Sequence, residues 1–305
     1  MKLHDTSTEL VHARDIMSLQ IHSLLPATPI PEGIHQLLAG QYSEMPIVNK
    51  SGEYCGMFSE KCCMKILSNL ADLIEDNQHT SFRAADVMIP RHKLFMLNPE
   101  DDVISAISAL LEKKYTGAPV VDSQGRCLGV FSERTCLGYV IEAIYSRVPS
   151  AQVQEFTDSD SNRLIDLETG LHQIFSIFDE TFYGRLPVIQ NNEIAGQVTR
   201  RDVLKHSTIL SNIMQSRLNA PHVDAGIPEA RTAAYSKAHD TFLNHPVSVF
   251  TEENSYTIDP EMSLLSVAQL FFDSPHRRFP VVEAGNLIGL VDRCDVLRFA
   301  IKLFK

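Results

Sequence analysis

The sequence predicts an α/β protein made of four copies of one unit, each running strand, helix, strand, strand, helix. The first observation is a nine-residue motif that recurs as GMFSEKCCM from Gly56, GVFSERTCL from Gly129, GQVTRRDVL from Gly196 and GLVDRCDVL from Gly289. The second is a proline that precedes each motif at a nearly constant distance. The third is the helical spacing of apolar residues on both sides. Such self-similarity is the signature of a repeat architecture.

Two strands are predicted around each proline. The apolar runs PIV, PVV, PVI and PVV begin at Pro46, Pro119, Pro187 and Pro280. Each run indicates a buried strand with proline at its first position, where no ladder hydrogen bond is lost. The turns NKSGE, DSQGR, QNNE and EAGN then lead into second strands, YCGMFS, CLGVFS, IAGQVT and LIGLVD.

Helices are predicted before and after each strand pair. The segments PEGIHQLLAGQY, PEDDVISAISALLEKKY, ETGLHQIFSIFDETFYG and PEMSLLSVAQLFFDS precede the prolines, and stretches such as RRDVLKHSTIL follow the second strands. A short extended piece, HSLLP, LFMLNP or SYTIDP, comes before three of the upstream helices. In the third unit, SNRLIDLETG lacks the corresponding proline, so its first strand is the least defined.

Composition and charge exclude several classes of protein. A chain of 305 residues with 44% hydrophobic and 21% charged residues is typical of a globular protein of about two domains. The net charge of -11 argues against broad nucleic-acid binding, which needs a basic face. The polar first ten residues predict no signal peptide, and no apolar run approaches a membrane span. The six cysteines lack a CxxC pattern, so we expect reduced thiols in a cytoplasmic protein.

No catalytic constellation is visible in the sequence. The twelve histidines are scattered without metal-ligand spacing, and neither a GxxxxGK[ST] loop nor a GxSxG elbow is present. The adjacent Cys62 and Cys63 favour a helix start over a redox centre, because neighbouring cysteines rarely bridge and no activating base is visible. We therefore expect a non-enzyme with no catalytic residues and no metal.

The order of the units and their motifs resemble the CBS domain, the module named after cystathionine β-synthase. The lead segments ARDIMS at 13–18 and AADVMIP at 84–90 also match the usual start of that domain, and the resemblance covers nearly the whole chain. It implies two pseudo-symmetric Bateman modules, 1–145 and 146–305, that pair face to face into a disk, within one chain or between two. It also implies a homodimer. The CBS repeats are expected at about 10–75, 80–145, 150–210 and 243–305.

Two positions of the motif bear on function. The position that starts the last helix holds Ser59, Ser132, Thr199 and Asp292, all good N-cap residues. The position three residues further on holds Cys62, Thr135, Asp202 and Asp295. The helix therefore does not require an acid there. Either a capping box or a ligand explains the two aspartates.

In CBS proteins that this chain resembles, the acid binds both ribose hydroxyls of an adenosine ligand, a role that suits a carboxylate. The preceding Ser or Thr and the helix N-terminus face the phosphates. The resemblance thus implies ribose contacts for Asp202 and Asp295 and a phosphate contact for Thr199. The rival interpretation is that both aspartates only cap helices.

Basic residues gather on the third and fourth units. Two positions before the strand proline stand Arg185 and Arg278, where the first units have Glu44 and Gly117. The resemblance implies phosphate contacts for both arginines. Further basic residues, which either contact phosphate or form a solvated rim, are Arg200, Arg201, His276, Arg277 and Arg293.

Asp292 departs from the family pattern, because a carboxylate repels a phosphate unless an arginine or a cation intervenes. The fourth unit is therefore expected to hold a ligand with less phosphate, a cationic one such as S-adenosylmethionine, a metal-bridged nucleotide, or none. The third unit matches the pattern better. The first module, in which Glu44 opposes an anion, is expected to serve packing and dimerisation. Segment 206–245 is expected to carry a helix near 228–243.

Together these features predict a regulatory protein that binds AMP, ADP or ATP in its C-terminal module and thereby changes the activity of an unidentified partner protein. The alternative is a non-catalytic interaction scaffold with vestigial sites. A third possibility makes the chain a regulatory subunit of a separate catalytic protein. Neither nucleic acid nor a membrane is expected as a partner.

Overall fold

The structure is a computed structural model that describes residues 10–68, 83–145, 151–159, 164–181, 183–191, 193–206, 246, 248 and 256–302. The helix predicted near 228–243, with nearly all of segment 206–245, lies outside the described residues. Within them, no helix has the length and apolar character that a membrane crossing requires.

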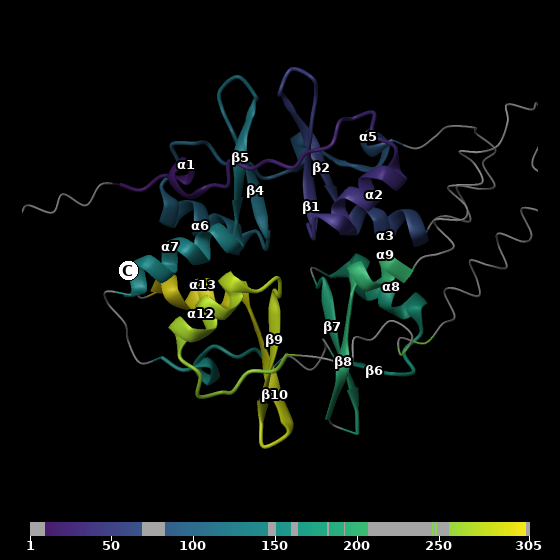
Figure 1. Ribbon diagram of the computed structural model, residues 1–305, viewed down its shortest axis with the longest axis vertical. Coiled ribbons are helices and arrows are strands. Elements are labelled where there is room, and N and C mark those ends of the chain that lie inside the picture. The colour runs from purple at the N-terminus through teal and green to yellow at the C-terminus, as the bar shows by residue number, and fades with distance from the viewer. Residues whose placement is uncertain are drawn as a thin grey trace, which may run out of the picture.

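The fold is α/β, so the predicted fold class is confirmed, and a hairpin between two helices recurs four times (Figure 1). The first strand of the predicted unit is a single parallel bridge, at Leu24, Leu97 and Ile258, in three repeats. The first repeat contains α1 (Ala13–Ile16), α2 (Ile30–Ala39), β1 (Glu44–Val48), β2 (Tyr54–Ser59) and α3 (Glu60–Ser68). The second contains α5 (Ala84–Val87), β3 (Ile89–Pro90), η1 (Arg91–Lys93), α6 (Val103–Glu112), β4 (Gly117–Val121), β5 (Cys127–Ser132) and α7 (Glu133–Tyr145).

The second half of the chain repeats this order. The third repeat contains η2 (Val153–Glu155), β6 (Ile165–Asp166), α8 (Leu171–Glu180), β7 (Arg185–Gln190), β8 (Glu193–Thr199) and α9 (Arg200–His206). The fourth contains α12 (Leu264–Asp273), β9 (Arg278–Glu283), β10 (Asn286–Asp292) and α13 (Arg293–Lys302). The first strand of the third repeat, poorly defined in the sequence, is present as β6, which pairs parallel with β7.

Each central strand begins two residues before its proline, so the predicted position of proline at the strand start was wrong. Pro46 is the third residue of β1 and lies opposite Met57 of β2. Its carbonyl accepts a hydrogen bond from the Leu24 amide on the other side of the strand, at 3.0 Å. The N–H and C=O of one strand residue point to the same side, so the donor that proline lacks faces the segment around Leu24 and not the hairpin.

The lead segment of one repeat packs on the neighbouring repeat. The Ala13 amide donates to Asp101 at 2.8 Å, and β3 adds to the hairpin of the first repeat by pairing with β2. Because these lead segments lie close against the second strand of the neighbouring hairpin, the motif position there has no room for a side chain. A Cβ at Gly56 would lie 2.5 Å from the carbonyl oxygen of Ile89, and the corresponding contacts recur at the motif glycines of the second and fourth repeats.

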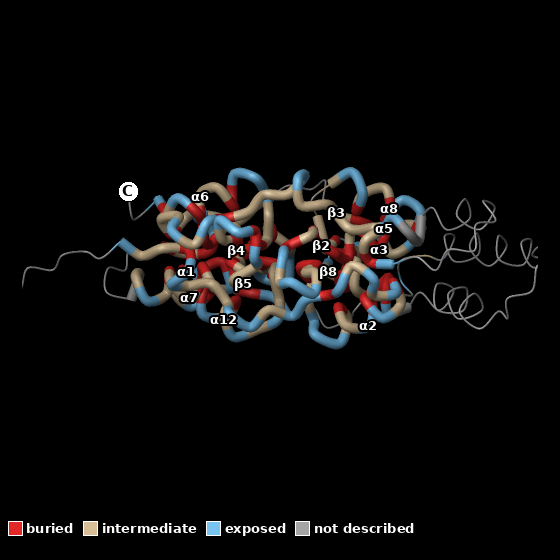
Figure 2. The backbone as a smooth tube through the Cα atoms, turned by 90° about the horizontal axis from the view of Figure 1, so that it is seen from above, coloured by how far each residue is buried: buried red, intermediate tan, exposed pale blue. Residues whose placement is uncertain are grey.

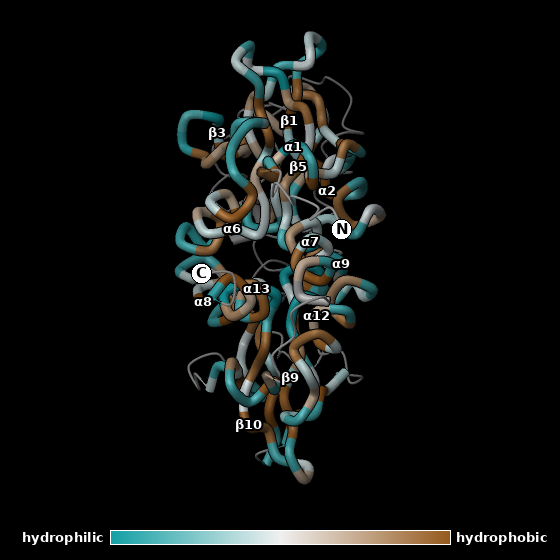
Figure 3. Tube along the Cα trace, turned by 90° about the vertical axis from the view of Figure 1, so that its left-hand side faces the viewer, coloured by the Kyte–Doolittle hydropathy of each residue, from teal (hydrophilic) through white to brown (hydrophobic). Residues whose placement is uncertain are grey.

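The two modules pair within one chain. One buried apolar cluster joins the first repeat to the third, and the other joins the second to the fourth. Helix α3 packs against α8 and α9, and α7 packs against α12 and α13. The hairpins point away from this contact (Figure 1), the body is flat when seen from above (Figure 2), and α7, α12 and α13 meet near its middle (Figure 3). The disk is thus formed by a single chain, and the homodimer stays a prediction.

Candidate adenosine-ligand site

The last helix of the third repeat begins with a complete capping box. The Thr199 amide and hydroxyl both donate to Oδ2 of Asp202, at 2.9 and 2.5 Å, and the Asp202 amide donates back to the Thr199 hydroxyl at 3.1 Å. Both side chains are buried, with Asp202 only 5% exposed. A buried carboxylate at this position therefore stabilises the helix start, as the capping interpretation requires.

The second repeat closes the same box without an acid, and the first repeat makes one of its two bonds. The Ser132 amide donates to the Thr135 hydroxyl at 2.9 Å, and the Thr135 amide donates to the Ser132 hydroxyl at 3.3 Å. In the first repeat, the Cys62 amide donates to the Ser59 hydroxyl at 3.2 Å. A hydroxyl is therefore enough to close the box, and the fold does not demand the carboxylates of the third and fourth repeats.

The two motif aspartates differ in what their oxygens already bind. Asp202 uses Oδ2 for both bonds to Thr199, and among the described residues its Oδ1 accepts no hydrogen bond. Asp295 accepts the Asp292 amide at 2.9 Å through Oδ2 and pairs with Arg298 at 3.0 Å through Oδ1. Oδ1 of Asp202 thus remains available as an acceptor in the third repeat, whereas Oδ1 of Asp295 in the fourth repeat is already paired with Arg298.

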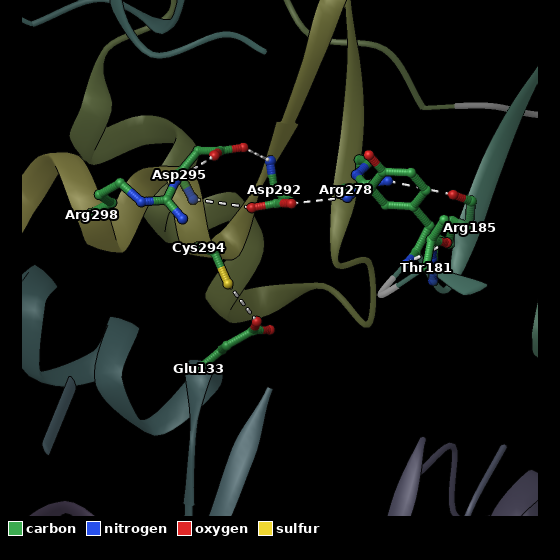
Figure 4. A network of polar contacts seen from close by, with 9 residues as sticks. Glu133, Thr181, Arg185, Arg278, Asp292, Cys294, Asp295 and Arg298 are labelled. Carbon is green, nitrogen blue, oxygen red and sulfur yellow. Dashed lines mark hydrogen bonds and ion pairs between the residues drawn. The ribbon is translucent and has the colours of Figure 1, made fainter. Parts of the chain in front are cut away.

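In the fourth repeat, Arg278, for which the sequence predicted a phosphate contact, is neutralised by a carboxylate of the same repeat. Arg278 pairs with Asp292 at 2.9 Å and also donates to the main-chain carbonyl of Arg185 at 3.4 Å (Figure 4). Burial alone would raise the pKa of Asp292, but the Arg278 charge and hydrogen bonds from Arg278 and Asp295 hold it below its ordinary value. Burial and the Asp292 charge raise the pKa of Asp295 to about 7.

Arg185 lies in a partly buried cluster of charges contributed by three repeats. Its Nη1 donates to Gln197 at 3.5 Å. Burial lowers the pKa of Arg185 to about 10 and the charge of Arg277 adds to this, while the carboxylates of Asp202 and Glu60 oppose the shift. Arg185 also lies opposite Thr199 in the β7–β8 ladder, and Thr199 is bonded to Asp202, so the three residues occupy adjoining positions.

Two arginines of the motif hold helix ends together. Arg200 donates to the carbonyl of Phe178 at 2.6 Å, at the C-terminal end of α8. Arg293 donates to the carbonyls of Phe271 and Ser274 at 2.9 and 3.0 Å, at the end of α12. A cation at a helix C-terminus binds free carbonyls and complements the dipole. These side chains share one motif position, and that shared position was the only sequence signal of their common role.

Carboxylates of the first module face the same charge cluster, and sequence reasoning had singled out only Glu44. Glu60, the first residue of α3, pairs with Arg201 of α9 at 3.0 Å. Glu133, the first residue of α7, accepts a hydrogen bond from the Cys294 thiol at 2.9 Å (Figure 4). Burial raises the pKa of both Glu44 and Glu133, and the charge of Arg277 opposes this.

A further groove lies in the second repeat and has a volume of about 610 Å³. Its lining includes neither Asp202 nor Asp295 and consists of residues 92–96, Lys113 and Tyr115. The rings of Phe95 and Tyr115 stack there, with centroids 6.2 Å apart. No motif in the sequence predicted this groove.

A scan against protein-family models places four matches on the chain, all to the CBS domain, at residues 13–69, 84–142, 163–208 and 247–302. The chain belongs to the CBS domain family. All nine residues that were assigned to a ligand from the sequence thus lie in the third and fourth CBS domains, namely Arg185, Thr199, Arg200, Arg201, Asp202, Arg277, Arg278, Asp292 and Asp295.

Relatives with CBS domains cover most of the chain. The chain is 23% identical to the chloroplastic CBS domain-containing protein CBSX2 of Arabidopsis thaliana, over 62% of this chain and 94% of that protein. The crystal structure of MJ1225 from Methanocaldococcus jannaschii, described as a proposed archaeal homolog of g-AMPK, matches with a TM-score of 0.77 at 19% identity, covering 95% of this chain and 99% of that one. A protein of Pyrococcus horikoshii matches with a TM-score of 0.55 at 17% identity, covering 95% and 100%. These likenesses show the fold.

The CBS repeats as described contain no group of three or more His, Cys, Asp or Glu side chains that could hold a metal ion. All six cysteines are free thiols, and Cys62, Cys63 and Cys136 are buried. Burial raises the pKa of Cys63, which favours an inert thiol over a reactive thiolate.

Proposed function

We propose that the second module binds an adenosine-containing ligand, of the class AMP, ADP or ATP, at the third repeat, and that binding changes a partner protein's activity. Family membership supports this proposal. The relative CBSX2 has been crystallised in complex with AMP. The ligand acts on the packing of the modules only through its different affinities for their arrangements.

The ribose hydroxyls are assigned to Asp202, and the phosphate to the Thr199 hydroxyl and Arg185. The observation that carries the assignment is Oδ1 of Asp202, which accepts no hydrogen bond from the described residues, on a carboxylate that the fold does not need, since Thr135 closes the same box with a hydroxyl. A carboxylate oxygen can accept hydrogen bonds from ribose hydroxyls.

The substitution Asp202→Thr tests this role, because it copies the second repeat and removes only the carboxylate. We expect its stability without ligand to stay within about 1 kcal/mol of wild type, since the cap persists. Hydrogen bonds to a charged group contribute about 1.5–3 kcal/mol, so AMP affinity should fall at least roughly tenfold. Titration calorimetry with AMP measures the loss. The matched variant Asp295→Thr should bind AMP as wild type does, and unchanged AMP affinity in Asp202→Thr would refute the assignment.

A second candidate concerns the fourth repeat. The partly buried pair of Arg278 with Asp292 leaves that repeat without a spare positive charge at this position, which favours a cationic adenosyl ligand such as S-adenosylmethionine over a nucleotide. Calorimetry with S-adenosylmethionine on wild type and Asp292→Ser tests it, and loss of binding in the variant is expected. If neither AMP nor S-adenosylmethionine binds, the interaction scaffold replaces both proposals.

A further inference from the structure

An ion pair between the two modules lies beside the proposed ligand site. Glu60 of the first module accepts from Arg201 of the second through one oxygen, at 3.1 Å from Nε and 3.0 Å from Nη2. The side chains are 10% and 19% exposed, so little solvent screens the pair. Separating charges that are this buried is costly, because each is left without a partner.

The pair belongs to the same charge cluster as the proposed ribose and phosphate ligands. Arg185 lies opposite Thr199 in the β7–β8 ladder, and Arg201 precedes Asp202 at the start of α9. The charges of Glu60, Arg201 and Asp202 all act on the pKa of Arg185. An anionic group bound between Arg185 and Thr199 therefore lies next to the helix start that carries Arg201, the partner of Glu60. A single phosphate can be matched by Thr199 and Arg185 alone. Further phosphates need another cation, and the guanidinium of Arg201 in the same helix start is already bound by Glu60.

We propose that Glu60 determines which ligand the site accepts: it occupies Arg201 and restricts the site to adenosine ligands with one phosphate group. This inference rests on the proposed function and narrows it to the monophosphate. A diphosphate or triphosphate either leaves its terminal phosphates near the Glu60 carboxylate or breaks the ion pair to reach Arg201. In both cases it binds more weakly than the monophosphate.

The second repeat provides a matched control. Glu133 stands at the position equivalent to Glu60, but it faces Cys294 in place of an arginine, and no ion pair to it occurs among the described residues. Burial also raises its pKa, which favours the neutral form. Glu133→Gln therefore removes the same chemical group without releasing an arginine.

The experiment is titration calorimetry of AMP and of magnesium-free ATP on wild type, Glu60→Gln and Glu133→Gln. Wild type should bind AMP at least tenfold more tightly than ATP. In Glu60→Gln this ratio should shrink tenfold or more, chiefly because ATP binds more tightly, while in Glu133→Gln it should stay within twofold. Glu60→Asp, which keeps the charge but shortens its reach, should shift the ratio in the same direction and replaces Glu60→Gln if that variant does not fold.

The outcomes separate the two proposals. An unchanged ratio in Glu60→Gln, or an equal change in Glu133→Gln, overturns the role of Glu60 and leaves the adenosine site standing. Tighter binding of ATP than AMP by wild type also overturns it. If neither ligand binds wild type, the proposed function fails, and the inference falls with it.

Discussion

Removing the side chain of Leu137 tests whether the two modules fold as one body. Leu137 is fully buried in α7, within the apolar cluster that joins this helix to α12 and α13 of the second module. Leu137→Ala removes this buried packing and leaves a cavity, at a cost of about 3 kcal/mol. The exposed Glu142 on the same helix provides a control, since Glu142→Ala should change stability by less than about 0.5 kcal/mol.

The size of the cooperative unit sets the shift in Tm. The unfolding entropy is about 2.1 cal/mol/K per residue, so a chain of 305 residues that unfolds as one unit loses about 5 °C. A unit of half that size would lose about 10 °C. Scanning calorimetry measures both the shift and the number of transitions. We expect one transition that moves as a whole. Two transitions, of which only one moves and by about 10 °C, would refute the single body.

Two further predictions follow from the site and the hairpins. The pKa of Asp295 is raised from an ordinary 3.8 to about 7, so the folded chain keeps a proton that the unfolded chain releases, and this contribution to stability declines from about pH 4 to pH 7. Asp295→Asn should flatten that part of the pH profile of the urea midpoint, and parallel profiles would contradict the assignment. Gly129→Ala places a Cβ 2.8 Å from the Ser18 carbonyl and should cost roughly 1–3 kcal/mol in urea unfolding, against little change for Gly170→Ala, where no atom lies within 4 Å.

The local elements could be read from the sequence because their signals are local. The turn between two apolar runs predicts each hairpin, and the spacing of Thr199 and Asp202 predicts a capping box that the structure contains. The start of β1 was predicted wrongly, because Pro46 stands inside the strand, on the side that faces the segment around Leu24. This segment precedes β1 by about twenty residues, so the local pattern around Pro46 does not reveal the contact.

Contacts between repeats were out of reach, because no periodic pattern encodes them. Glu60 and Arg201 are 141 positions apart, and each alone is an ordinary charged residue at a helix start. The pairing of Arg278 with Asp292 was likewise not predicted, although Asp292 is an unusual residue to find beside a phosphate. The candidate site could therefore be located from its motif, but its charge balance depends on how four repeats meet.

A structure of the protein crystallised with AMP tests the central claim most directly. The account predicts ribose hydroxyls on Oδ1 of Asp202, the phosphate against Thr199 and Arg185, and the Glu60–Arg201 pair intact. AMP bound elsewhere, with Asp202 contacting only Thr199, would contradict it.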